Sequence, residues 1–113
     1  MSTQLPERRA PLHPGEILAE EFLRPLGLTQ VAVAERLAIP FQRLNQVVRG
    51  RRAVTPDTAL RLAQFFGTSA ELWLNLQQRW DLHHAARAPA SHSISTIRPL
   101  RKPSPRRPKR RAG

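Results

Sequence analysis

Cysteine is absent from the 113-residue chain, and so is any long apolar run. Without cysteine the chain has no disulfide framework and no thiolate metal site, which is compatible with a reducing compartment. No run approaches the roughly 18 apolar residues that a membrane-spanning helix needs. The first 20 residues also lack the apolar core of a signal peptide. We therefore expect a cytoplasmic protein that does not enter a membrane.

Acidic residues are missing from one end of the chain. The sequence has 19 Lys and Arg against eight Asp and Glu, a formal net charge of +11. Residues 87–113 hold nine of the basic residues and no acidic one, whereas residues 1–86 hold the other ten and all eight acids. This imbalance is typical of a chain that binds a polyanion.

Composition divides the chain into three predicted segments. Residues 1–11 are polar and read as a flexible N-terminal arm, and residues 12–86 have helical patterning. Residues 87–113 contain five prolines and few apolar side chains, so we expect a disordered basic tail. Three roles are open for this tail: contact with DNA phosphates, an extension without function, or capture of a protein partner by folding on binding.

Residues 12–86 carry closely spaced helix start and stop signals. Proline at a first helical position, capping threonines and a capping box mark the starts, and glycines follow most of the ends. No strand is predicted, so the fold class is all-α with five helices. The helices are predicted to begin near Pro14, Thr29, Pro40, Thr55 and the box 68–71, and to end near Leu23, Leu37, Gly50, Gly67 and Ala86.

The segment 29–50 (TQVAVAERLAIPFQRLNQVVRG) has the spacing of two helices that cross over a short turn. Ala34 is small where the helices would touch, and Ala38 stands where the turn needs a permissive residue. Leu44 and Val47 return the second helix to the core. This spacing is typical of a DNA-binding helix-turn-helix, although an ordinary antiparallel helix pair in a bundle also satisfies it.

The polar face of the second of these helices favours the DNA-binding interpretation. Glutamine can pair bidentately with adenine, and arginine with guanine. Basic residues just after this helix, and free N–H groups at the start of the preceding one, suit phosphates. The candidate base-reading residues are Gln42, Arg43 and Gln46, and the candidate DNA-backbone contacts are Thr29, Gln30, Asn45, Arg49, Arg51 and Arg52.

Two further patterns bear on assembly and catalysis. Trp73, Leu76 and Trp80 form a stripe at helical spacing, which predicts either core packing or a dimer seam. The adjacent His83 and His84 diverge on a helix and cannot hold one metal together. We predict no metal, no cofactor and no enzymatic activity, since no nucleophile–base arrangement or phosphate loop is present.

From His13 to about Ala86 the chain resembles the HigA-type antitoxins, a branch of the lambda-repressor-like (XRE) helix-turn-helix proteins. The matching stretches are HPGEILAEEFLRPLGLTQ, LNQVVRGRRAVTPDTALRLAQFFGTS and ELWLNLQQRWDL. The resemblance implies a five-helix lambda-repressor-like bundle and a homodimer. It also implies neutralisation of a RelE-like mRNA-cleaving toxin and binding of double-stranded DNA at a palindrome in the promoter of the pair.

By position, the resemblance makes Gln30 a phosphate contact and residues 49–52 backbone contacts, and it agrees with the three base-reading candidates. Ala38 departs from the frequent turn glycine, and the long basic tail departs from the usual short ending. Two other functions stay open. The chain is alternatively a free-standing XRE-type repressor without a toxin, or a nucleic-acid-compacting protein dominated by its tail.

Overall fold

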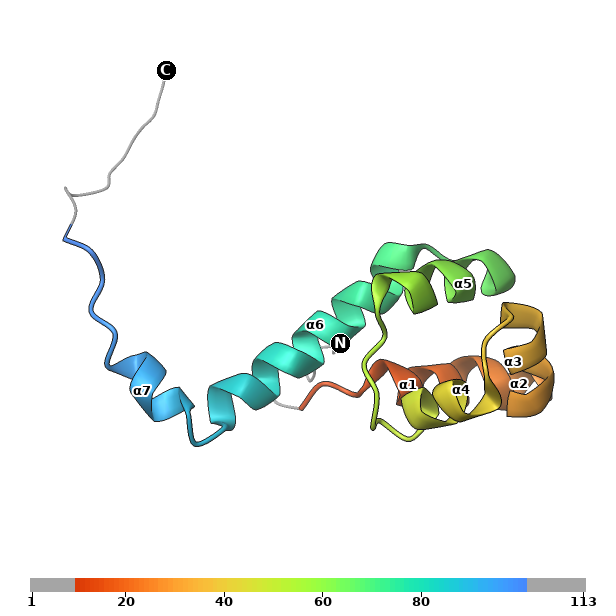
Figure 1. Ribbon diagram of the computed structural model, residues 1–113, viewed down its shortest axis with the longest axis horizontal. Helices are drawn as coiled ribbons and strands as arrows, with labels where there is room; N and C mark the ends of the chain where they lie inside the picture. Colours follow the sequence, from red (N-terminus) through yellow and green to blue (C-terminus); the bar gives the residue numbers. More distant parts are fainter. Residues whose placement is uncertain (1–9, 102–113) are drawn as a thin grey trace, which may run out of the picture.

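The computed structural model describes residues 10–101 (Figure 1). A histidine cap starts the N-terminal helical run. The Gly15 N–H donates a hydrogen bond to Nδ1 of His13 at 2.9 Å, and α1 (Pro14–Ile17) begins there. The run continues through the π-helical η2 (Leu18–Leu23) into α2 (Arg24–Leu26). It ends at Gly27, whose left-handed conformation suits glycine.

Pro25 lies inside this helical run, so the predicted end near Leu23 was wrong. A proline donates no backbone hydrogen bond, and its ring crowds the carbonyl four residues earlier. The wide π turn meets this constraint, because the Arg24 N–H bonds to the carbonyl of Ala19, five residues back. The helix therefore continues past Pro25 to Leu26.

The remaining predicted helices are confirmed, and the described residues contain no strand. They are α3 (Gln30–Leu37), α4 (Phe41–Val48), α5 (Pro56–Phe66) and α6 (Ala70–Arg87). The hydroxyl groups of Thr29 and Thr55 cap α3 and α5 as expected. The cap of α6 is one residue later than predicted. Ser69 accepts the hydrogen bond from Leu72 N–H, while the Thr68 hydroxyl instead accepts one from the indole Nε1 of Trp73 at 2.8 Å.

One apolar core joins all of these helices. Trp73 is fully buried at its centre, and the tilted ring of Phe22 lies 5.3 Å from it between centroids. The helices α5 and α6 pack against one another, and α1 contacts both α4 and α6. The buried apolar residues are Leu18, Leu23, Val33, Ala34, Leu37, Ile39, Leu44, Val47, Val54, Ala59, Leu62 and Trp73.

The C-terminal part of α6 extends beyond α5 (Figure 1). A short helix that we did not predict, α7 (Ser91–Ser95), follows it within the segment expected to be a disordered tail. The rest of that prediction, for residues 102–113, and most of the predicted arm, residues 1–9, lie outside the described part of the chain.

Candidate nucleic-acid interface

The helices α3 and α4 form the crossed pair that the sequence predicts. Ala34, Leu44 and Val47 are buried where the pair meets the core. The turn between them depends on Ala38, which has a φ of 60° in the left-handed region. Pro40 then precedes the first residue of α4. The arrangement turns the other face of α4 toward solvent.

That solvent-facing surface of α4 contains two of the three candidate base readers. Gln42 and Gln46 are exposed. Phe41, at the first position of the helix, is 45% exposed. Glutamine side chains on an accessible helix can present both a donor and an acceptor to a base edge.

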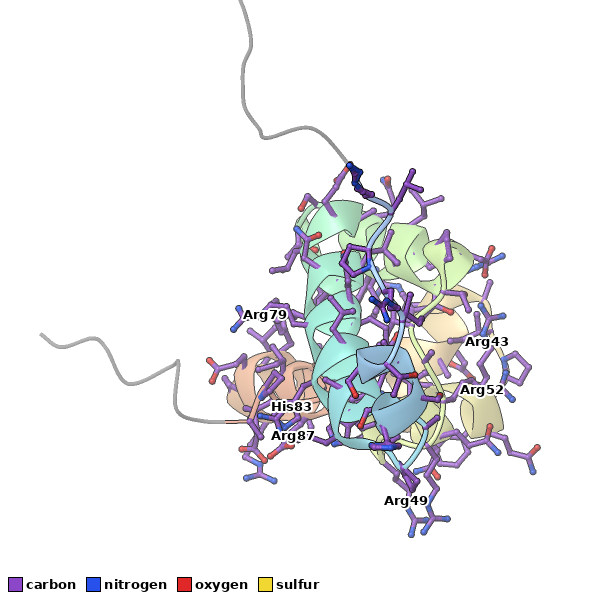
Figure 2. The ribbon with its side chains drawn as sticks, turned by 90° about the vertical axis from the view of Figure 1, so that its left-hand side faces the viewer. Arg43, Arg49, Arg52, Arg79, His83 and Arg87 are labelled. Carbon is purple, nitrogen blue, oxygen red and sulfur yellow. The ribbon has the colours of Figure 1, made fainter. Side chains whose placement is uncertain are left out.

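Gln46 is held by Arg52, one of the residues predicted to contact the DNA backbone. Nε of Arg52 donates a hydrogen bond to Oε1 of Gln46 at 2.9 Å. Arg49 and Arg51, in the same loop, are exposed. Neither forms an ion pair with a carboxylate within residues 10–101. Figure 2 shows Arg43 and Arg52 on one side of the molecule and Arg49 at its lower end. This surface therefore combines exposed glutamine side chains with cations.

Asn45 joins the two helices rather than lying free. Its Nδ2 donates a hydrogen bond to Oε1 of Gln30 at 3.0 Å. Thr29 is exposed, but its hydroxyl accepts the capping bond from Ala32 N–H at 3.1 Å. The Asn45–Gln30 bond therefore links α4 to the N-terminal end of α3, where free N–H groups favour a phosphate.

Arg43 is bound to α5 and only partly exposed, whereas the two glutamines are exposed. Its Nη2 lies 2.6 Å from Oδ2 of Asp57 and 2.7 Å from Oγ1 of Thr58, and its side chain is 26% exposed. Asp57 also accepts a hydrogen bond from Arg61 Nε at 2.9 Å. These bonds, from Arg61 first and Arg43 second, hold the pKa of Asp57 below its ordinary value.

Arg43 thus ties α4 to the first turn of α5. This role is not visible in the sequence, because Asp57 follows Pro56 and has the pattern of an ordinary first-turn acid. The pair is 14 residues apart in the chain, so helix periodicity could not have revealed it.

The tryptophan stripe is divided between two environments. Trp73 is in the core, Leu76 packs against the core, and Trp80 is half-buried. The Trp80 ring stacks on His84 with centroids 4.0 Å apart and meets the edge of His13 at 5.0 Å. The partial exposure of Trp80 leaves a contribution to a dimer seam open.

A buried glutamine between these tryptophans supports the arginine loop from behind. Oε1 of Gln77 accepts a hydrogen bond from the Val54 N–H at 2.8 Å, and its Nε2 donates one to Asp81. Both Gln77 and Val54 are buried. The bond anchors the end of the loop that carries Arg49, Arg51 and Arg52, although the sequence showed Gln77 only as one polar residue on a helix.

Metal sites and membrane-spanning helices are absent from the described residues. Within residues 10–101 no three His, Cys, Asp or Glu side chains gather as metal ligands. In the same range no helix is both long and apolar enough to cross a membrane. The arrangement on α4 and the following loop is therefore the strongest candidate site that these residues form.

Comparison with known proteins agrees with this geometry. Residues 20–73 match the family model described as helix-turn-helix. The chain is 47% identical over 89 residues to the virulence-associated protein I of Dichelobacter nodosus, covering 79% of this chain and 81% of that protein. It is 36% identical over 75 residues to the antitoxin HigA-1 of Vibrio cholerae, covering 66% and 70%.

Among solved structures, the Pseudomonas aeruginosa antitoxin HigA with the higBA promoter superposes with a TM-score of 0.75 and 39% identity. The match covers 80% of this chain and 98% of that one. Sequence and fold agree over the same helices, so the chain belongs to the HigA-type antitoxins, a branch of the DNA-binding helix-turn-helix proteins.

Proposed function

We propose that this protein is the antitoxin of a type II toxin–antitoxin module. It neutralises a RelE-like mRNA-cleaving toxin by direct binding, and as a homodimer it represses its own operon at a palindromic operator. The observation that carries the DNA half is the exposed polar face of α4, bordered by the arginine loop and fixed by the Asn45–Gln30 bond. Membership of the HigA-type antitoxins supports the toxin half.

In the DNA complex, Gln42 and Gln46 read base edges in the major groove. The Arg52–Gln46 bond holds the second glutamine in a defined orientation before DNA arrives, which reduces the conformational entropy lost on binding. Arg49, Arg51 and Arg52 contact phosphates, and so do Gln30 and the N-terminal end of α3.

Arg43 has a changed role in this proposal. It reaches a base only if it leaves Asp57 and Thr58, to which its guanidinium donates hydrogen bonds. We therefore assign Arg43 to the positioning of α4 rather than to base reading. Base specificity then rests mainly on Gln42 and Gln46.

A twofold dimer gives the palindrome its spacing. Two recognition helices related by a dyad read half-sites about 34 Å apart, one turn of DNA. The half-buried face around Trp80 is a candidate part of the seam between the two copies.

The toxin is proposed to bind elsewhere, on the N-terminal helical run. Glu16 and Glu21 are exposed there, and Glu20 is paired with Arg24 at 3.1 Å. A basic toxin would complement this acidic surface and leave α4 free for DNA.

Co-purification tests this function. The full chain is tagged in its native host, isolated at moderate salt after nuclease treatment, and its bound partners are weighed by intact-mass spectrometry. A stoichiometric small basic protein is the expected result. A bare homodimer would contradict the toxin half and favour a free-standing repressor.

A charge reversal locates the toxin surface. Glu21→Lys should reduce recovery of the toxin, whereas Glu71→Lys, an exposed acid on α6, should leave it unchanged. Equal recovery with both variants would place the toxin on another surface.

A further inference from the structure

Three basic side chains lie in a row along α6, away from the DNA-binding surface proposed above. Arg79, His83 and Arg87 follow one another at intervals of four residues. Figure 2 shows them on the opposite side of the molecule from Arg43 and Arg52. We call these three residues the α6 stripe.

The α6 stripe is not neutralised by acidic side chains of the described chain. Arg79 and Arg87 are exposed, and neither forms an ion pair within residues 10–101. Arg87 Nη1 instead donates a hydrogen bond to the His83 carbonyl at 3.1 Å, which keeps its guanidinium along the helix. The acid nearest in sequence, Asp81, accepts a hydrogen bond from Gln77 Nε2 at 2.9 Å.

The surroundings of His83 are positive as well. Its pKa lies below the ordinary value, first because of desolvation and then because of the charges of Arg87 and His84. No carboxylate contributes to this shift. After Asp81 the described residues contain no further Asp or Glu, whereas they contain Arg87, Arg98 and Arg101. The stripe therefore stands in a positive field that favours an anionic ligand.

We propose that the α6 stripe is a second phosphate-binding surface, which takes the backbone of duplex nucleic acid without regard to sequence. Arg79 and Arg87 are eight residues apart, about 12 Å along the helix axis, so the stripe presents two cations to a regularly charged strand, with the imidazole N–H of His83 as a hydrogen-bond donor between them. Arginine suits phosphate because its guanidinium donates two parallel hydrogen bonds. The proposal rests on the proposed function only in taking α4 as the first DNA-binding surface.

This surface has a distinct consequence. Because it faces away from α4, it does not read the base pairs that α4 reads. It raises affinity for any duplex, and it lets one molecule hold a further stretch of DNA beside the operator.

The test measures how the affinity of the full-length chain for a scrambled 20-base-pair duplex depends on salt, by fluorescence anisotropy. The stripe variant is Arg79→Gln with Arg87→Gln. The control, Arg24→Gln with Arg36→Gln, removes the same charge from arginines outside both surfaces. Each phosphate contact contributes about 0.9 to the slope of log K against log salt.

The stripe variant should therefore lose about 2 from this slope, and the control should lose none. Between about 50 and 200 mM salt, the wild type should then lose about tenfold more affinity than the stripe variant. The charge-conserving variant Arg79→Lys with Arg87→Lys should restore the slope. Because the duplex carries no operator, failure of α4 to read sequence leaves this result unchanged.

Two results would overturn the proposal. The first is an equal slope for the stripe variant and the control. The second is an unchanged slope together with lost binding of polyglutamate, which would assign the stripe to an acidic protein. A combined variant checks that the stripe and the α4 surface are separate. Adding Arg51→Gln to the stripe variant should lower the slope by about 1 more. If the two surfaces were one, the combined reduction in slope would be smaller than the sum of the two separate reductions.

Discussion

Gly15 lies directly against the backbone of Val47. A Cβ atom at Gly15 would overlap the Val47 carbonyl oxygen. The start of α1 therefore touches the last turn of α4, with no room for any side chain between them. Because α4 presents the proposed base readers, this contact fixes where they stand relative to the rest of the bundle.

Gly15→Ala should lower the free energy of unfolding by about 3 kcal/mol, because backbone rather than a flexible side chain must move to relieve the overlap. Urea unfolding followed by circular dichroism measures this. The control is Gly27→Ala, at a left-handed glycine with open space around it, which should cost about 1 kcal/mol. Equal costs would show that the α1–α4 contact is not tight.

Ala38→Gly should stabilise the protein by about 1 kcal/mol, since glycine adopts the left-handed conformation of this turn without the cost of about 1–2 kcal/mol that L-residues incur. Part of this gain is offset by the greater freedom of glycine in the unfolded chain. The same urea titration measures the change. A loss of stability would mean that the methyl group of Ala38 makes contacts that outweigh the strain.

Arg43→Ala and Asp57→Ala should be non-additive in stability, because each removes the same ion pair between α4 and α5. The double variant should lose less free energy of unfolding than the two single losses together. The matched cycle on Glu20 and Arg24, an exposed pair within one helical run, should be nearly additive. Additive losses at Arg43 and Asp57 would return Arg43 to the candidate base readers.

Gln42→Ala should weaken binding to a duplex selected from random sequence by ~1–3 kcal/mol and relax specificity at one base pair per half-site. Arg51→Ala should weaken selected and scrambled duplexes alike and reduce the salt slope by about 1. Anisotropy titrations on both duplexes separate these effects. Equal losses on both duplexes for Gln42→Ala would exclude it as a reader.

The protein should lose stability as the pH falls from about 7.5 to about 5.5, because burial holds the pKa of His13 below its ordinary value of 6.5. The unfolded chain then takes up the proton first, so the stabilisation present above 6.5 is lost below it. Asp81 and Glu16 oppose this shift but do not cancel it. The proton also competes for the Nδ1 atom that accepts the Gly15 N–H.

Thermal melts at the two pH values measure the effect. His13→Asn keeps a capping side chain without a titratable ring, and it should flatten the pH dependence. His83→Gln is the control, since the pKa of His83, a partly exposed residue of α6 that caps no helix, is also lowered. A pH dependence removed by His83→Gln and kept by His13→Asn would contradict the assignment.

The local elements were determined by the sequence itself. Thr29, Thr55 and the left-handed glycines mark helix ends through capping and backbone conformation, which depend only on near neighbours. The same is true of the periodic apolar residues of α4 and the exposed Gln42. The π turn before Pro25 could not be predicted from local sequence. A helix can end at a proline or widen ahead of it, and packing selects between the two.

Only the tertiary structure decided which polar side chains are free. Arg43 and Gln42 are neighbours in sequence and look alike as readers, yet Arg43 is bound by Asp57 and Thr58 from α5. Asn45 is likewise bound by Gln30, whereas Gln46 stays exposed and is oriented by the bond from Arg52. A hydrogen bond between distant segments depends on how helices cross, and this crossing is set by close contacts such as Gly15 on Val47. Local sequence patterns carry no information on such contacts. The sequence therefore predicted the α4 surface, and the tertiary contacts decided the role of each side chain on it.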